Sequence, residues 1–256
     1  MEELTALAGI GQAGLLAGFV VFLRVGAAMA VLPAFGEQNI PPRIRLSLAL
    51  AFTLIVAPAV DVSGVQASPA VLLPLLATEP LVGLAFGLVL RLMIFVLQMA
   101  GSMAAQSTSL SQLLGGAAGE PLPAFGHVLV IGGLALAVLS GLHVRIAEAL
   151  VASYVDFPIG LGIDSATLAE IWVARVGDAF ALAFSLAAPF VIAAFLYNLA
   201  LGAINRAMPQ LMVVLVGAPA ITAGGLALLA LLAPLLLQLW LEVLQDVLAD
   251  PFGGGR

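Results

Sequence analysis

Few side chains in this sequence could perform catalysis or bind a metal ion. The two histidines, His127 and His143, are separated by a hydrophobic stretch and lack the spacing of an HExxH zinc motif. Cysteine is absent, which excludes thiolate metal sites, cysteine nucleophiles and disulfide bonds. The sequence therefore predicts no metal site.

The nearest approach to a nucleophile with a base is Ser140, three residues before His143. An intramembrane serine protease would need a Gly-x element before the serine and a further histidine downstream, and both are missing here. The glycine clusters lack the Lys-Ser/Thr pair that a phosphate-binding loop requires. We expect a protein that is not an enzyme and that carries no cofactor.

Arginines within apolar stretches are more informative. Arg24, Arg91 and Arg206 would each cost about 2.5 to 3.5 kcal/mol at the centre of a bilayer. The carboxylates that could pair with them inside the chain are Glu79, Glu148 and Asp178. In the alternative interpretation the arginines lie near helix ends, where their side chains reach the membrane interface. The sequence leaves both interpretations open.

Composition predicts a membrane protein. Of the 256 residues, 63% are hydrophobic and 9% charged, and the mean hydropathy is +1.21, whereas soluble domains are about 45 to 50% apolar. Eight arginines and no lysines stand against 14 acidic residues, so the net charge is −6 and a nucleic-acid partner is not expected. The apolar surface must face membrane lipid or other subunits.

The elements that hold these residues are expected to be helices. Apolar stretches lie at about 13–35, 46–60, 70–105, 128–142, 179–204 and 211–244. They are rich in Leu and Ala and show no alternation of period two, which disfavours strands. We therefore predict an all-α fold of six hydrophobic segments, built from helical hairpins with short or broken helices.

Two of these segments are shorter than the roughly 20 residues that a membrane-spanning helix needs. They are Ser47 to Ala57, between two prolines, and Val128 to Leu142. We expect both to be half-spanning or tilted. Glycines four residues apart, Gly14 with Gly18 and Gly83 with Gly87, predict close approach between helices.

Two polar interruptions separate the apolar segments. The first, from Gln106 to Pro123, is rich in glycine and predicts a flexible loop. The second, at about 143–178, is the most hydrophilic part of the chain, and we interpret it as a loop as well. A mobile loop between buried helices could close a pore.

A secondary transporter is one possible function for such a chain. Buried polar residues would then line a substrate path, and the candidates are Gln98, Gln106, Asn198 and Asn205. Inverted repeats would support this interpretation. The only internal similarity, between 48–58 and 226–234, runs in the same direction and is explained by low complexity.

A set of motifs favours a different function. The most specific is Asn205-Arg206-Ala207-Met208-Pro209-Gln210-Leu211, followed by Val216-Gly217-Ala218-Pro219. Further matching segments are 24–35, 41–45, 79–83 with Gly87, 98–101 with Gln106, 141–143, and Ser153 with 157–158. In this order, over nearly the whole chain, they resemble the FliR/SctT family, which supplies one subunit of the type III export gate of flagella and injectisomes. The Arg-Ala-Met-Pro-Gln run favours the flagellar branch.

The resemblance implies a multi-subunit assembly in the bacterial inner membrane, at the flagellar basal body. One copy of the chain would join FliP-like and FliQ-like subunits around a pore for unfolded export substrates. Residues 1–164 would form a FliP-like part and residues 165–256 a FliQ-like hairpin. FlhB-type and FlhA-type gate proteins and a soluble export ATPase would be further partners.

The resemblance also implies roles for particular residues. The loop from Gln106 to Phe125 would be the plug of the resting pore, although Glu120-Pro121 stands where the family pattern has Asp-Pro. The plug residues would be Leu110, Leu113, Leu114, Gly115, Gly116, Gly119, Glu120 and Pro121. Residues expected to act in assembly or as buried charges are Arg24, Glu79, Arg91, Arg206, Pro209 and Gln210.

Overall fold

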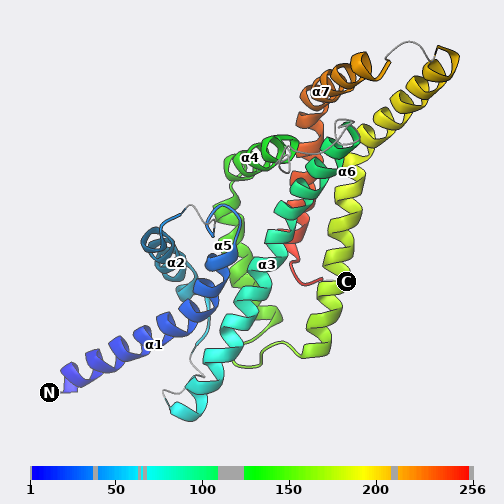
Figure 1. The fold of residues 1–256 in the computed structure, drawn as a ribbon. Helices are drawn as coiled ribbons and strands as arrows, with labels where there is room; N and C mark the ends of the chain where they lie inside the picture. The colour runs from blue at the N-terminus through cyan, green and yellow to red at the C-terminus, as the bar shows by residue number, and fades with distance from the viewer. Residues whose placement is uncertain are drawn as a thin grey trace. The chain divides into compact units, whose positions relative to one another are not determined.

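The computed structural model describes residues 2–36, 40–62, 65, 68–108, 124–208 and 213–253. These residues form seven α-helices and one turn of 3-10 helix, with no strand among them (Figure 1). The elements are α1 (Glu2–Val31), α2 (Pro42–Val56), η1 (Ala57–Ala59), α3 (Pro69–Thr108), α4 (Ala124–Leu139), α5 (Leu142–Asp156), α6 (Ser165–Ala207) and α7 (Val213–Ala249). The all-α prediction is confirmed.

Five helices in the described ranges are long and apolar enough to cross a membrane. They are α1, α2 with η1, α3, α6 and α7. The pair α4 and α5 adds a sixth span if it counts as one, although its two helices are bent by 75°. This agrees with the six hydrophobic segments predicted from sequence. Gly141, with φ of +88°, makes the break, since a left-handed conformation strains other residues.

The segment predicted at Ser47 to Ala57 is longer than expected. Helix α2 begins at Pro42, because a proline in the first turn of a helix lacks only an N–H that would have no helical partner. At the other end of α2, Pro58 lies within the 3-10 turn η1, which extends the helical segment to Ala59. The resulting 18 residues reach the length of a candidate span.

The hydrophilic segment at 143–178 is not a loop, so that expectation was wrong. It contains most of α5 and the start of α6, and the connector is only Phe157 to Asp164. In α5 the buried residues recur at helical spacing, as Leu142, Ile146, Ala149, Leu150, Ser153 and Tyr154. The charged residues of α5 occupy its exposed face, so its polarity reflects an amphipathic helix.

The first interruption begins within a helix, since Gln106 to Thr108 belong to α3, and α4 starts directly after it at Ala124. The residues between them, 109–123, lie outside the described ranges, and all eight predicted plug residues fall there. Pro209 and Gln210 also lie outside the described residues.

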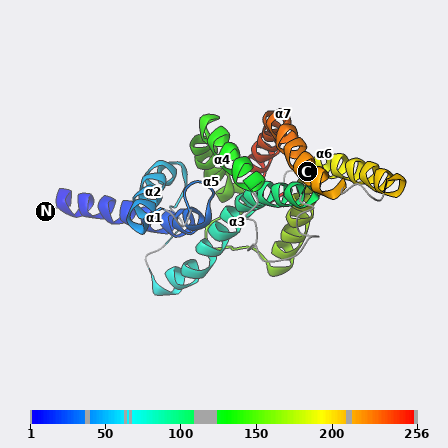
Figure 2. The same ribbon diagram turned by 45° about the horizontal axis from the view of Figure 1, so that its top comes forward.

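The chain divides into two compact units. Unit 1 comprises Met1–Leu92, Val138–Arg175 and Leu244–Arg256. Within it α2 lies beside α1 in both views (Figure 1, Figure 2), and Phe35 meets Phe52 edge to face at 5.7 Å between ring centroids. Unit 2 comprises Met93–Ala137 and Val176–Val243, so its core is made by the second half of α3 with parts of α4, α6 and α7.

Candidate functional site

Unit 1 is organised around the guanidinium group of Arg24 on α1. Its Nε donates to Glu79 Oε2 on α3 at 2.8 Å, forming an ion pair whose side chains are 1% and 0% exposed. Nη1 donates to the carbonyl and hydroxyl oxygens of Ser153 at 2.9 and 3.2 Å, and Nη2 to the Phe157 carbonyl at 2.8 Å. One side chain therefore joins α1, α3, α5 and the connector after α5.

The second carboxylate oxygen of Glu79 fixes the connector from another direction. Glu79 Oε1 accepts the backbone N–H of Gly160 at 3.0 Å. Gly160 and Gly162 have φ of +83° and +66°, so the turn suits glycine at both positions. Both oxygens of the carboxylate thus have donors, as a buried charge requires.

An aromatic ring covers the ion pair. The Arg24 guanidinium carbon lies 3.7 Å from the centroid of the Tyr154 ring, within the range of a cation–π interaction. The Tyr154 hydroxyl is buried and has no hydrogen-bond partner among the described residues. The ring, rather than the hydroxyl, is what Tyr154 contributes to this cluster.

Four residues at four-residue spacing on α3 lie against α1. Glu79 pairs with Arg24, and a Cβ on Gly83 would overlap the Arg24 backbone carbonyl. A Cβ on Gly87 would come within 2.7 Å of the Ala28 carbonyl oxygen, so this glycine also lets the helices touch. Arg91 Nη1 then donates to the Val31 carbonyl at 3.2 Å, at the last residue of α1. We call Glu79, Gly83, Gly87 and Arg91 the α3 ridge.

The α3 ridge fixes both the separation and the register of α1 and α3. The glycines set how near the helices lie, and the charged residues set which turns face each other. Removing one member of a buried ion pair typically costs about 3 to 5 kcal/mol, because the other charge is left without compensation. The cluster is therefore a structural junction whose charged groups are already engaged. Among the described residues, no three or more His, Asp or Glu gather where they could hold a metal ion.

The other predicted residues are dispersed. Arg206 is exposed in the last turn of α6, as expected for an arginine near a helix end. Arg24 instead pairs with a carboxylate inside the protein, which was the other interpretation. Glu148 makes only an exposed contact of 3.5 Å with Arg145, and Asp178 is exposed. Gly14 and Gly18 have open space around them within the described chain, unlike Gly83 and Gly87.

The proposed transporter residues do not gather around a buried path. Gln98, Gln106, Asn198 and Asn205 are all exposed. Two aromatic residues of unit 2 donate to backbone carbonyls: Trp240 Nε1 makes a buried hydrogen bond to Met93 at 2.7 Å, and the Tyr197 hydroxyl makes a partly buried one to Gly217 at 2.8 Å.

A second junction in unit 1 was missed from sequence. Arg175 on α6 donates to the carbonyls of Asp250 and Pro251, which follow the end of α7. Phe252 is buried and meets Phe157 edge to face at 4.8 Å, next to the carbonyl that Arg24 uses. The sequence does show an apolar Phe252 after the end of a helix and a Gly253 that favours a turn. A hydrogen bond to a backbone carbonyl, however, cannot be predicted from residue types, because every residue has such a carbonyl.

Fold and site together define an all-helical protein with several candidate membrane-spanning helices, and its buried charged residues, among those described, form an arginine–glutamate junction. Residues 15–247 match the model of the bacterial export proteins, family 1, and the chain belongs to this family.

Individual relatives agree with the family match. The chain is 34% identical over 233 residues to the flagellar biosynthetic protein FliR of Caulobacter vibrioides, covering 90% of this chain and 93% of the relative. It is 28% identical over 221 residues to FliR of Escherichia coli, covering 85% and 84%. FliR of Bacillus subtilis is 27% identical over 205 residues, covering 78% and 79%. The family predicted from the sequence motifs is thereby confirmed.

Proposed function

We propose that this chain is a non-enzymatic component of the flagellar protein-export apparatus in the bacterial inner membrane. The observation that carries the proposal is similarity along most of the chain to relatives named flagellar biosynthetic proteins. The helices long enough to cross a membrane support the location. The engagement of the buried charges in a structural junction supports a role in assembly rather than in catalysis.

We further propose that the chain forms a gated pore for unfolded polypeptides together with FliP-like and FliQ-like subunits, with FlhB-type and FlhA-type proteins as partners. Support comes from exposed apolar surface. Within the chain, only 33% of the apolar stretch of α6 and 22% of that of α7 is buried, against 61% of that of α3. Such surface must contact lipid or neighbouring subunits. The start of α6 at Ser165 is compatible with a FliQ-like hairpin over 165–256 after a FliP-like part over 1–164.

The plug is proposed to lie between α3 and α4, where the glycine-rich segment joins two helices. Its leucines would exclude water from the closed pore, and an incoming polypeptide would displace it without unfolding the helices. Deleting Ser111 to Gly119 is expected to preserve copurification with FliP-like and FliQ-like subunits but to make cells leak small ions. Unchanged ion permeability with normal assembly would contradict the plug.

The export role itself is tested by deleting the gene and restoring it. We expect loss of flagella, of motility and of secreted flagellar proteins, with recovery from the wild-type gene. Uptake of small solutes should be unaffected. Normal flagella together with a defect in uptake of one solute would contradict the export role and favour a secondary transporter.

A further inference from the structure

The residues that follow α7 form a compact turn within unit 1. The Asp250 carboxylate accepts the backbone N–H of Gly253 at 2.7 Å, and Gly253 has a φ of +73°, which suits glycine. Pro251 and Phe252, between these two residues, are both buried. Buried residues directly after a helix end indicate a segment that packs against the protein. We call Asp250 to Gly253 the 250–253 turn.

Arg175 on α6 holds this turn by its backbone. Its Nε donates to the Pro251 carbonyl at 3.2 Å, and its Nη2 donates to the Asp250 carbonyl. The carbonyls at the end of a helix lack helical partners and carry the negative end of the helix dipole, which attracts a cation. The last turn of α7 contains no basic residue. Arg175 therefore supplies from α6 the cation that the end of α7 lacks.

Phe252 brings the turn against the connector between α5 and α6. Its ring meets the Phe157 ring edge to face, with 4.8 Å between the centroids. The Phe157 carbonyl accepts a hydrogen bond from Arg24 Nη2 at 2.8 Å, and three residues later the Gly160 N–H donates to Glu79 at 3.0 Å. The residue that contacts the turn thus also contacts the buried ion pair.

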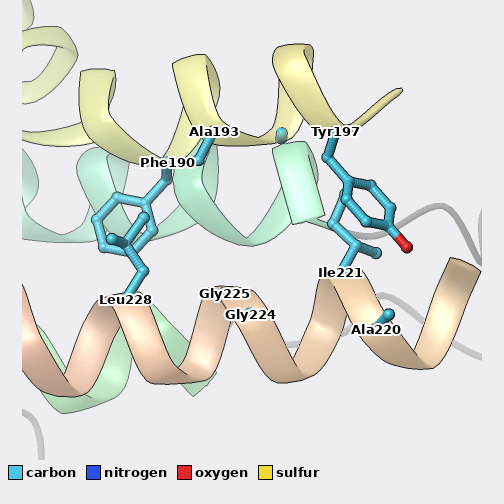
Figure 3. Close-up of a pocket in the computed structure, with 9 residues that line it drawn as sticks. Phe190, Ala193, Tyr197, Ala220, Ile221, Gly224, Gly225 and Leu228 are labelled. Carbon is cyan, nitrogen blue, oxygen red and sulfur yellow. The ribbon is translucent and has the colours of Figure 1, made fainter. Parts of the chain in front are cut away.

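In unit 2 the same two helices leave space between them (Figure 3). A pocket of about 190 Å³ lies there, with Phe190 and Leu228 facing each other at one end and Tyr197 over Ile221 at the other. Groups that line a void have no partner atoms on that side, so this part of the contact contributes less packing energy than a filled one. The hold of Arg175 on the end of α7 matters correspondingly more for keeping the two helices together.

We propose that the 250–253 turn is a strap that closes the buried junction. While the turn is docked, Phe252 keeps Phe157 in the position from which its carbonyl binds Arg24. When the turn is released, the connector loses that support and Arg24 loses one of its acceptors. This inference concerns contacts within unit 1 and not the export role, so either can fail without the other.

Amide hydrogen exchange of the connector tests the proposal. The full chain, with the subunits that copurify with it, is compared in detergent micelles as wild type and as Phe252→Ala. We expect exchange at 157–164 to become several-fold faster in the variant, because the connector opens more often. Phe184→Ala is the matched control, since Phe184 lies on α6 in unit 2 with 61% of its surface exposed. It should leave exchange at 157–164 unchanged.

A second variant releases the turn without touching the aromatic contact. Arg175→Gln removes the cation at the end of α7 and keeps Phe252, so it should also speed exchange at 157–164. Arg206→Gln, at an exposed position on α6, is its control and should have no effect there. If Phe252→Ala fails to fold, the comparison of Arg175→Gln with Arg206→Gln decides the question.

A change of background tests whether the turn acts on the junction itself. Arg24→Met with Glu79→Leu removes the charged pair and with it the group that the Phe157 carbonyl binds. Phe252→Ala should then accelerate connector exchange by a smaller factor than it does in the wild type. Residues that share no partner usually have independent effects. An equal factor in both backgrounds would therefore overturn the proposal.

Two further results would also overturn it. Unchanged exchange at 157–164 in both Phe252→Ala and Arg175→Gln would show that the turn does not hold the connector. An equal acceleration at 190–197 in unit 2 would show a general loss of stability in place of release of the connector.

Discussion

Both units bury aromatic rings, but the buried charged pair lies in unit 1, and no charged side chain is buried among the described residues of unit 2. In unit 1 Arg24 and Glu79 are almost inaccessible and bind five further groups between them, counting the Tyr154 ring. In unit 2 the contacts are of the kind made by Phe125 and Phe190, whose ring centroids lie 5.9 Å apart. Removing one partner of a buried ion pair typically costs about 3 to 5 kcal/mol, whereas a volume-conserving exchange between apolar side chains usually costs less than about 1.5 kcal/mol. We infer that substitutions in the charged junction of unit 1 are tolerated less well than apolar exchanges in the core of unit 2.

The largest effect should follow from breaking the pair in unit 1. Arg24→Met leaves the Glu79 carboxylate buried without its cation, which should lower the free energy of unfolding by about 3 to 5 kcal/mol. The measurement is unfolding of the purified chain in detergent micelles. Arg206→Met, at an exposed position on α6, should leave the chain's stability unchanged.

A double variant sharpens this test. Arg24→Met with Glu79→Leu removes both charges, so much of the lost stability should return. If the double variant is no more stable than Arg24→Met alone, then the hydrogen bonds to Ser153 and Phe157, and not the unpaired carboxylate, dominate the junction.

A smaller effect should follow from separating the helices. Gly83→Ala places a methyl group against the Arg24 backbone and should cost about 1 to 3 kcal/mol of unfolding free energy. Gly177→Ala, in the part of α6 that belongs to unit 2, meets open space and should be neutral or stabilise by up to about 1 kcal/mol. If Gly83→Ala and Gly177→Ala changed the free energy of unfolding equally in the same assay, the proposed difference between the two units would be wrong.

The smallest effect is expected at the ring over the ion pair. Tyr154→Phe keeps the ring beside the guanidinium and removes a buried hydroxyl that has no partner among the described residues. Stability should change by less than about 0.5 kcal/mol, while Tyr154→Leu should lose the cation–π contribution of about 1 to 2 kcal/mol. A large loss on Tyr154→Phe would show that the hydroxyl is hydrogen-bonded after all.

The positions of most helices could be predicted because long runs of Leu and Ala leave no other structure in a membrane. Arg24 and Glu79 could be identified as unusual for the same reason, but their pairing could not, since it depends on the register between α1 and α3. The four-residue spacing of the α3 ridge shows that its charged residues and glycines share one face of α3. It does not show which turns of α1 they meet.

Two features were missed for different reasons. The charges of α5 made it look like a loop, although its apolar residues recur at helical spacing and mark an amphipathic helix. The junction of Arg175 with the end of α7 uses backbone carbonyls, which every residue possesses. The predicted plug residues remain a prediction, because residues 109–123 lie outside the described ranges.

The junction at Arg24 also sets an order of events during synthesis. Its partners lie 55, 129 and 133 residues further along the chain, at Glu79, Ser153 and Phe157. At a translation rate of about 5 to 20 residues per second, Glu79 emerges roughly 3 to 11 s after Arg24, and Phe157 roughly 7 to 27 s after it. The Arg24 cation on α1 therefore stays incompletely bound until Phe157 has been made, when more than half of the protein has been synthesised.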